Sequence, residues 1–376
     1  METIITIKDL RKVYKLGSEK VVALDNINLE IQKGQVCCIL GTSGSGKSTL
    51  LNQLAGLEKP TRGAVYIGKN NISKFGEDRL AAFRQRNIGF IFQSYNLMTS
   101  HTALENVAMP LMFRGVPKAK REKIAAQMLR EVGLEKRMHH RPNQMSGGQQ
   151  QRVAIARTLA PNPRVLLMDE PLSNLDAKLR NDMRAELKRL HMATGATFVY
   201  VTHDQSEAMT LSSKVCLIKE GVLQQYCPPL ALYGEPANLF CADFMGNPTM
   251  NFISCHGIKK DQAVELTCRH FSVRFTPNQP LALPAEGDYV LGVRPEFVKV
   301  SADEGIEGTV VSSLPSGMET TLSLAVKDIT LSAVAFGSID FAMDSVIHFG
   351  FEGDRYILFD AQSTENLGLG SLQILN

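Results

Sequence analysis

The chain has 376 residues, a length beyond the size at which one hydrophobic core keeps growing, so we expect two domains. Hydrophobic residues make up 44% of the chain and charged residues 21%, which are the proportions of an ordinary globular protein. The formal net charge of +3 is too small to indicate binding to a nucleic acid or to an anionic membrane surface. We therefore expect no nucleic-acid partner.

The cysteines and the apolar runs indicate the cellular compartment in which the protein is expected to work. The seven cysteines are scattered and contain no Cys-x-x-Cys pair, which indicates reduced thiols in a cytoplasmic protein rather than disulfides or a zinc site. The segment that starts at Met1 lacks the basic and apolar regions of a signal peptide. The longest apolar runs, such as 36–40, are too short to span a bilayer. Any role at a membrane is therefore expected to depend on a partner.

Up to about residue 235, short apolar runs alternate with amphipathic helical patterns, which is typical of βαβ units around a parallel sheet. Leu50, Leu51, Leu54 and Leu57 have the spacing of a helix that starts near Ser48. A second helical stripe consists of Leu179, Met183, Leu187 and Leu190. Residues 102–132 are predicted to be mostly helical, within a helical subdomain at about 94–157. Strands are predicted at 36–40, 88–92, 165–168 and 197–201.

The pattern changes after residue 235. Alternation with a period of two appears at 271–275, 289–293 and 320–324, and clusters of Gly, Pro, Asn and Asp separate these segments. Such a pattern is typical of a small all-β barrel or sandwich. The predicted fold is therefore an α/β domain at 1–235, followed by an all-β domain at 236–376.

The segment after the first predicted buried strand matches the phosphate-loop pattern G-x-x-x-x-G-K-[ST], and a helical pattern follows it. The glycines let the backbone wrap a triphosphate, and the helix N-terminus adds partial positive charge. Lys47 is expected to reach the β- and γ-phosphates, and Ser48 to ligate Mg²⁺. An ordinary Gly/Ser turn is the alternative, which the flanking strand and helix disfavour. The predicted nucleotide contacts here are Gly41, Thr42, Ser43, Gly44, Ser45, Gly46, Lys47, Ser48 and Thr49.

Two carboxylates, Asp169 and Glu170, end another apolar strand, where ligands bind in open α/β sheets. Asp169 is predicted to hold Mg²⁺ through water, and Glu170 to orient or deprotonate the attacking water. Alone, the pair could also be an exposed acidic turn that caps the next helix. The phosphate loop upstream favours the catalytic interpretation.

Three further side chains are candidates. Gln93 follows the strand at 88–92 and is placed to contact Mg²⁺ or its water, although a surface amide is the alternative. His203 ends the strand at 197–202 and could donate to a γ-phosphate oxygen, unless it is a structural histidine. Tyr14 could stack on adenine or pack locally.

A Ser-Gly-Gly-Gln segment has nothing hydrophobic to bury and offers backbone N–H groups to an anion at the start of a helix. Its residues are Ser146, Gly147, Gly148 and Gln149. The motifs follow one another along the chain in the same order as in ABC-transporter ATPase subunits, which the first domain resembles from end to end. In chain order they are the phosphate loop, Gln93, residues 146–149, Asp169-Glu170, residues 173–176 and His203.

That resemblance implies a homodimer in which residues 146–149 close on the γ-phosphate held by the opposite phosphate loop. It also implies ATP and Mg²⁺ as ligands and closure of the dimer before in-line attack by water. Integral-membrane permease subunits would hold the chain at the cytoplasmic face of the cell membrane, and an extracytoplasmic solute-binding protein would act through them.

The subfamily resemblance differs along the chain. Residues 171–180, 244–253 and 292–296 are similar to the ATPase subunits of maltose and oligosaccharide importers, whose C-terminal regulatory domain is a small barrel of OB-like type. Residues 43–52 and 88–97 resemble the MacB and lipoprotein-release type. The extra domain favours import of a sugar, an oligosaccharide or a related solute. A lipoprotein-release system is the alternative. A soluble ABC protein of DNA repair or the ribosome is disfavoured, because those usually carry a coiled-coil insert or two fused ATPase domains.

Overall fold

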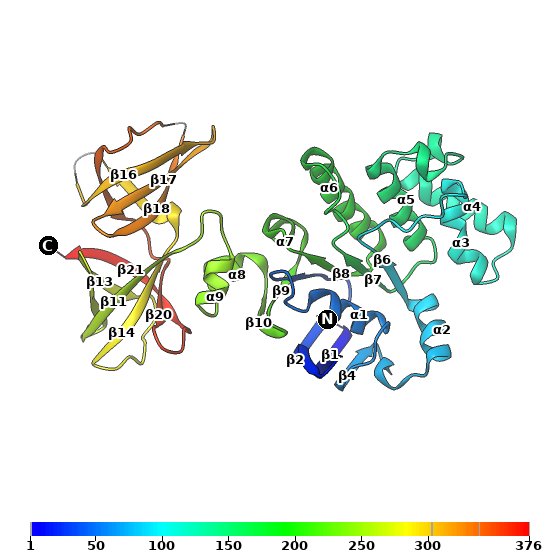
Figure 1. Ribbon diagram of the computed structural model, residues 1–376, viewed down its shortest axis with the longest axis horizontal. Coiled ribbons are helices and arrows are strands. Elements are labelled where there is room, and N and C mark those ends of the chain that lie inside the picture. Colours follow the sequence, from blue (N-terminus) through cyan, green and yellow to red (C-terminus); the bar gives the residue numbers. More distant parts are fainter. Residues whose placement is uncertain (1, 302–303, 338, 376) are drawn as a thin grey trace. The chain divides into compact units, whose positions relative to one another are not determined.

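The computed structural model describes residues 2–301, 304–337 and 339–375. The chain divides into two compact units, Met1–Pro229 and Leu230–Asn376, which are described separately below (Figure 1). The predicted domain boundary at residue 235 lies a few residues beyond this division. Among the described residues, no helix is long and apolar enough to cross a membrane.

The first unit contains a six-stranded sheet with the order β10-β9-β3-β8-β7-β6. Neighbouring strands are parallel except β10, which pairs antiparallel with β9. All residues of β3 and β8 are buried, as expected for a sheet covered on both faces, so these strands are continuous apolar runs in the sequence. The strand predictions in this unit are therefore confirmed. The six strands are β3 (Val36–Leu40), β6 (Ile88–Ile91), β7 (Val165–Asp169), β8 (Thr197–Thr202), β9 (Lys214–Lys219) and β10 (Val222–Cys227).

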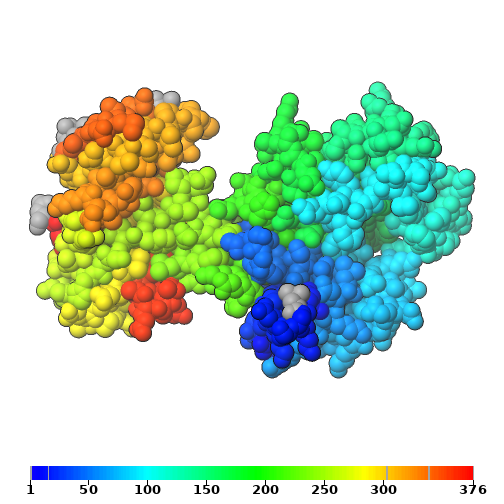
Figure 2. Space-filling view, in the orientation of Figure 1, coloured from blue at the N-terminus to red at the C-terminus, as the bar shows by residue number. Residues whose placement is uncertain are grey.

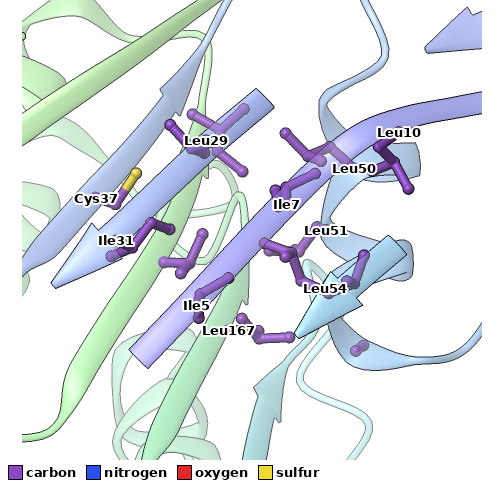
Figure 3. Packing of buried hydrophobic residues seen from close by; sticks show 14 of the residues in the cluster. Ile5, Ile7, Leu10, Leu29, Ile31, Cys37, Leu50, Leu51, Leu54 and Leu167 are labelled. Atoms are coloured by element: carbon purple, nitrogen blue, oxygen red, sulfur yellow. The ribbon is translucent and has the colours of Figure 1, made fainter. Parts of the chain in front are cut away.

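A second sheet of this unit has the order β2-β1-β4-β5 and is antiparallel. Its strands are β1 (Thr3–Leu16), β2 (Glu19–Gln32), β4 (Arg62–Ile67) and β5 (Asn70–Asn71). Helix α1 (Lys47–Ala55) shares one buried cluster with both sheets, and Figure 3 shows Leu51 and Leu54 with Ile5 and Ile7 of β1. This packing holds α1 against the sheets, and with it the phosphate loop that joins the end of β3 at Leu40 to the start of α1.

The prediction that Leu57 belongs to this helix is wrong. Helix α1 ends at Ala55 because Gly56 adopts a left-handed conformation with φ of 63°. Leu57 therefore lies beyond the helix and is 47% exposed. Periodicity alone could not locate this end, because a leucine happens to continue the spacing past the glycine.

The remaining helices of the first unit include the predicted helical insert, which is confirmed as α3 and α4. Both pack with α5, and the cyan surface of residues 103–131 lies at the edge of this unit, away from the blue N-terminal strands (Figure 2). The helices are α2 (Glu77–Asn87), α3 (Ala103–Phe113), α4 (Lys118–Glu131), α5 (Gly147–Leu159), α6 (Ala177–Thr194) and α7 (Gln205–Leu211). Short 3₁₀ turns lie at η1 (Ile72–Lys74), η2 (Glu135–Arg137) and η3 (Pro142–Gln144).

The second unit is all-β apart from short helices, as predicted. Six strands close a barrel in the order β11-β12-β13-β21-β20-β14, and five form a sheet in the order β15-β19-β16-β17-β18. Barrel and sheet share one buried hydrophobic cluster. The barrel strands are β11 (Asn251–Lys260), β12 (Ala263–Cys268), β13 (Ser272–Pro277), β14 (Glu286–Val293), β20 (Tyr356–Asp360) and β21 (Asn366–Leu375). The sheet strands are β15 (Val298–Ser301), β16 (Ile306–Pro315), β17 (Glu319–Val326), β18 (Ile329–Phe336) and β19 (Val346–Phe351).

Arg294, which follows β14, connects the barrel to α8 (Pro229–Gly234) and α9 (Leu239–Phe244). Its guanidinium is buried, donates to the carbonyl oxygens of Tyr233 at 2.8 Å and Ala242 at 3.2 Å, and also bonds the Met245 carbonyl. It stacks 4.0 Å from the Tyr233 ring centroid, and burial lowers the pKa of Arg294. These bonds explain why residues 230–234, which were predicted to end the first domain, belong to the second unit. Another 3₁₀ turn, η4 (Pro295–Phe297), follows.

We expect Arg294→Met to loosen the α8–α9 segment by about 3 kcal/mol, because two buried and one part-buried carbonyl oxygens lose their charged donor. The measurement is hydrogen exchange of the peptides that span α8, α9 and the end of β14. Lys299→Met is the control, because the Lys299 ion pair with Glu352 is exposed and worth little. Exchange rates equal in the two variants would contradict the assignment.

Candidate nucleotide-binding site

The phosphate loop joins β3 to α1, and its geometry dictates its glycines. Gly46 is the N-cap of α1 and has φ of 101°, a conformation that residues with a Cβ rarely adopt. A Cβ at this position would lie 2.4 Å from the carbonyl oxygen of Ala23 in β2. Among the described residues, no side chain caps the start of α1, so its first backbone amides are available to phosphate groups.

Lys47 and Ser48 point into the same region. The ammonium of Lys47 donates to the carbonyl oxygens of Gly41 at 3.0 Å and Thr42 at 2.7 Å. Burial lowers the pKa of Lys47, whereas the nearby carboxylates of Glu170 and Asp169 oppose that shift. Lys47 thus presents a poorly hydrated cation at the loop.

Asp169 ends β7 and accepts a hydrogen bond from Ser48 Oγ at 3.3 Å. Burial raises the pKa of Asp169, and the charge of Glu170 raises it further, while the Ser48 bond and Lys47 act in the opposite direction. Two of the three residues predicted at the Mg²⁺ site, Ser48 and Asp169, are thus in direct contact, whereas Gln93 contacts Ser173.

Glu170 and His203 meet across the ends of β7 and β8. His203 Nδ1 lies 3.2 Å from Glu170 Oε1. Glu170 has a positive φ of 42°, and its backbone is held by a bond from its amide to Val201 O at 3.1 Å and by Ser173 Oγ, which donates to the Glu170 carbonyl at 2.9 Å. These bonds stabilise an unfavourable backbone conformation that aims the carboxylate at the imidazole.

A cavity of about 590 Å³ lies at the carboxyl ends of these strands. It brings the phosphate loop together with Glu170 and His203, which sequence analysis predicted from separate motifs. Val21, Val22 and Ala23 of β2 also line it, and no sequence motif indicated them, because their place depends on the pairing of β1 with β2. The other lining residues are Ser43, Gly44, Gly46, Lys47, Ser48 and Thr49.

Tyr14 and Gln93 lie outside the set of described residues that line this cavity. Tyr14 Oη donates to Glu58 Oε2 at 2.6 Å, and the Lys12 ammonium lies 4.9 Å from the centroid of its ring. These contacts favour local packing, the alternative for Tyr14, over stacking on adenine. Gln93 Nε2 lies 3.4 Å from Ser173 Oγ, so it contacts the loop that follows Glu170.

Ser146 is the N-cap of α5 and forms a capping box with Gln149. The Ser146 hydroxyl accepts from the Gln149 amide at 3.4 Å, and Gln149 Oε1 accepts from the Ser146 amide at 3.1 Å. Gly148 packs against α6, where a Cβ would lie 2.6 Å from Leu179 Cδ2. Among the described residues that line the cavity, none comes from 146–149.

The residues present fit a Mg²⁺-nucleotide. Ser45 Oγ is buried and has no hydrogen-bond partner among the described residues, so the loop retains polar capacity for a ligand. The hydroxyl of Ser48 and the carboxylate of Asp169 are hard oxygen donors of the kind that Mg²⁺ prefers. Lys47 and the amides at the start of α1 supply the positive potential that a triphosphate needs.

Comparisons with known proteins agree with this geometry. Residues 24–173 match the family model described as ABC transporter. The trehalose/maltose import ATP-binding protein MalK of Thermococcus litoralis is 37% identical, over 93% of this chain and 94% of that protein. The osmoprotective compounds uptake ATP-binding protein GgtA of Synechocystis is 40% identical, over 74% of each chain. A dimeric post-hydrolysis structure of the ATP-binding cassette MJ0796, bound to ADP and Pi, is 42% identical with a TM-score of 0.56, covering 60% of this chain and 99% of that one.

The chain therefore belongs to the ABC transporter family of ATP-binding subunits. Its activity is that of the family's ATP-hydrolysing transport ATPases. The predicted P-loop ATPase domain and the all-β second domain are both confirmed. None of the relatives named above is described as a lipoprotein-release protein, so the MacB-type resemblance of the first half stays a prediction.

We expect Gly46→Ala to weaken ATP binding by at least about 10-fold, because its Cβ must displace the Ala23 carbonyl or shift the loop. Titration calorimetry with ATP measures this. Gly44→Ala is the matched control, since Gly44 also has a positive φ of 76° but a Cβ there meets nothing within 4 Å. Equal losses in both variants would show that backbone strain, and not the close approach, decides the effect.

Proposed function

We propose that this chain is the ATPase subunit of an importer for a sugar, an oligosaccharide or a related solute. The observation that carries the proposal is the length of the similarity, because the MalK relative matches over 93% of the chain, second unit included. That protein is named for trehalose and maltose import, and GgtA for uptake of osmoprotective compounds. The solute class is therefore best stated as sugars and related small solutes.

In the proposed reaction, Lys47 and the loop amides hold the β- and γ-phosphates of ATP. Ser48 and Asp169 would hold Mg²⁺, with Gln93 at its water, and the ion when bound neutralises charge on the phosphates. Glu170 orients the attacking water and takes its proton. His203, in contact with Glu170 at 3.2 Å, donates to a γ-phosphate oxygen.

We propose that two copies of the chain share each ATP. Residues 146–149 start a helix whose first residues, Ser146 and Gly147, are exposed, and a helix N-terminus suits an anion. Their absence from the described lining of the cavity in their own chain supports a role at the site of a second copy. The dimeric state of the similar ATP-binding cassette gives the same indication.

The proposed membrane partners are permease subunits at the cytoplasmic face, through which an extracytoplasmic solute-binding protein acts. A groove of about 390 Å³ between β6 and α3 supports docking of a permease segment, since it is lined by Phe90, Phe92, Met109 and Phe113. Phe113 is 68% exposed, which favours a partner at this position.

The test is reconstitution with permease subunits that co-purify with this chain. Proteoliposomes that contain the complex, a solute-binding protein and ATP should accumulate labelled maltodextrin or a related solute. Vesicles with the Glu170→Gln chain are the matched control and should not accumulate it. ATP-dependent release of a lipoprotein, without uptake of any small solute, would contradict the proposal and favour the alternative.

A further inference from the structure

Four charged side chains at the contact of α6 and α7 lie beside His203. We call Arg180, Arg184, Asp204 and Glu207 the α6–α7 charge cluster. Arg184 Nη2 lies 3.0 Å from Asp204 Oδ2, and Arg180 Nη1 lies 3.5 Å from the same oxygen. Arg184 is also 3.8 Å from Glu207, whose side chain is 4% exposed. Two cations thus face two carboxylates where water screens them only partly.

This cluster fixes the chain on both sides of His203. Asp204 Oδ1 accepts from two backbone amides in the first turn of α7, at 2.8 and 3.2 Å. The Asp204 amide donates to Thr202 Oγ1 at 3.0 Å, and that hydroxyl donates to Glu207 at 2.7 Å. Both neighbours of His203 are therefore anchored, while its imidazole remains 62% exposed and contacts Glu170.

Arg180 links this segment to the loop that carries the catalytic carboxylate. Its Nη2 donates to the Leu175 carbonyl at 3.1 Å, in the loop between β7 and α6. The same loop contains Ser173, whose hydroxyl donates to the Glu170 carbonyl at 2.9 Å. One guanidinium therefore contacts the segments of both Glu170 and His203, a geometry that suits the planar fork of arginine and not a single ammonium.

We propose that Arg180 and Arg184 are positioning residues for ATP hydrolysis. They fix the positions of the Glu170 and His203 segments relative to each other and do not contact the nucleotide. This inference rests on the roles proposed above for Glu170 and His203. Among the described residues, neither arginine lines the nucleotide cavity, so we expect ATP affinity to stay unchanged when they are replaced. A misplacement of about 1 Å in a catalytic group can slow a reaction about 100-fold, so kcat depends on this contact while KM does not.

Two conservative variants of the full chain test the proposal and leave a polar side chain at each position. Arg180→Lys keeps the positive charge but replaces the planar guanidinium by an ammonium. Asp204→Asn loses the charge but keeps an oxygen that caps α7. Each is expected to lower kcat for ATP about 10-fold while KM and the thermal midpoint stay near those of the original chain. Arg189→Lys is the control on the same helix, where an exposed arginine pairs with Glu186.

The double variant distinguishes positioning from general loss of structure. Because both substitutions break the same contact, Arg180→Lys with Asp204→Asn should be no slower than the slower single variant. Multiplying effects, a raised KM, or unchanged kcat in both single variants would overturn the inference. If the Asp204→Asn chain does not fold, Arg180→Lys decides, because the Arg180 side chain is 31% exposed and the substitution keeps its charge.

His203→Ala separates this inference from the proposed function. Turnover that survives in that variant would remove the role of His203, and the proposed positioning with it. Loss of turnover in His203→Ala, with full kcat in Arg180→Lys and Asp204→Asn, would overturn the positioning proposal alone.

Discussion

Replacing Glu170 by Gln is expected to lower the rate of ATP hydrolysis by about 100-fold or more and to leave ATP binding intact, because the amide cannot take a proton from water. The substitution preserves volume, and Lys47 keeps its contacts with the loop. ATP should therefore accumulate between two subunits and hold them together. Phosphate release measures the rate, and size-exclusion chromatography with and without ATP measures the dimer.

The matched control for that experiment is Glu220→Gln. Glu220 is exposed and has a positive φ of 49°, close to the 42° of Glu170, but it lies in the turn between β9 and β10. Its replacement tests the general cost of Gln in this backbone conformation. If the Glu170→Gln chain hydrolyses ATP at nearly the rate of the original chain, Glu170 is not the base.

Ser146→Arg is expected to block hydrolysis while the isolated chain binds ATP with unchanged affinity. The new side chain occupies the N-terminus of α5, which does not border the cavity in its own chain as far as the structure describes it. Loss of the cap costs about 1 kcal/mol, too little to unfold the domain. Calorimetric ATP titration and phosphate release measure the two effects separately.

Thr102→Arg is the control for the lost cap, because Thr102 forms the same kind of capping box at α3. A mixture of Ser146→Arg chains with Lys47→Ala chains gives a sharper test. Mixed dimers would contain one complete site if residues 146–149 serve the opposite chain, and activity should exceed that of either variant alone. Weakened ATP binding by the Ser146→Arg monomer would contradict that arrangement.

The sequence was most informative where a motif or a buried strand determines position locally. Strands β3 and β8 are covered on both faces, so their apolar runs could be recognised without tertiary information. Glu170 and His203 were each predicted from the end of a buried strand, where ligands bind in open α/β sheets. Their contact was not predicted, because it depends on the order of the strands in the sheet.

Features that depend on long-range pairing could not be predicted. Val21 and Val22 of β2 line the cavity and pair with Tyr14 and Val13 of β1, in a hairpin whose several register shifts no local pattern determines. Tyr14 contacts Glu58, a residue distant in sequence, and this bond disfavours the stacking role. The division of the second unit into a barrel and a sheet depends on β21 returning to pair with β13.

The contact of Gly148 with α6 gives one glycine two separate reasons for lacking a side chain. An anion at the helix N-terminus requires close approach of the backbone. Independently, a methyl group there would force Leu179 to move, whether or not nucleotide is bound. Inactivity of a Gly148→Ala chain would therefore not distinguish a lost phosphate contact from a displaced helix. Ser146 is the more informative position, because it is exposed and its side chain caps its own helix.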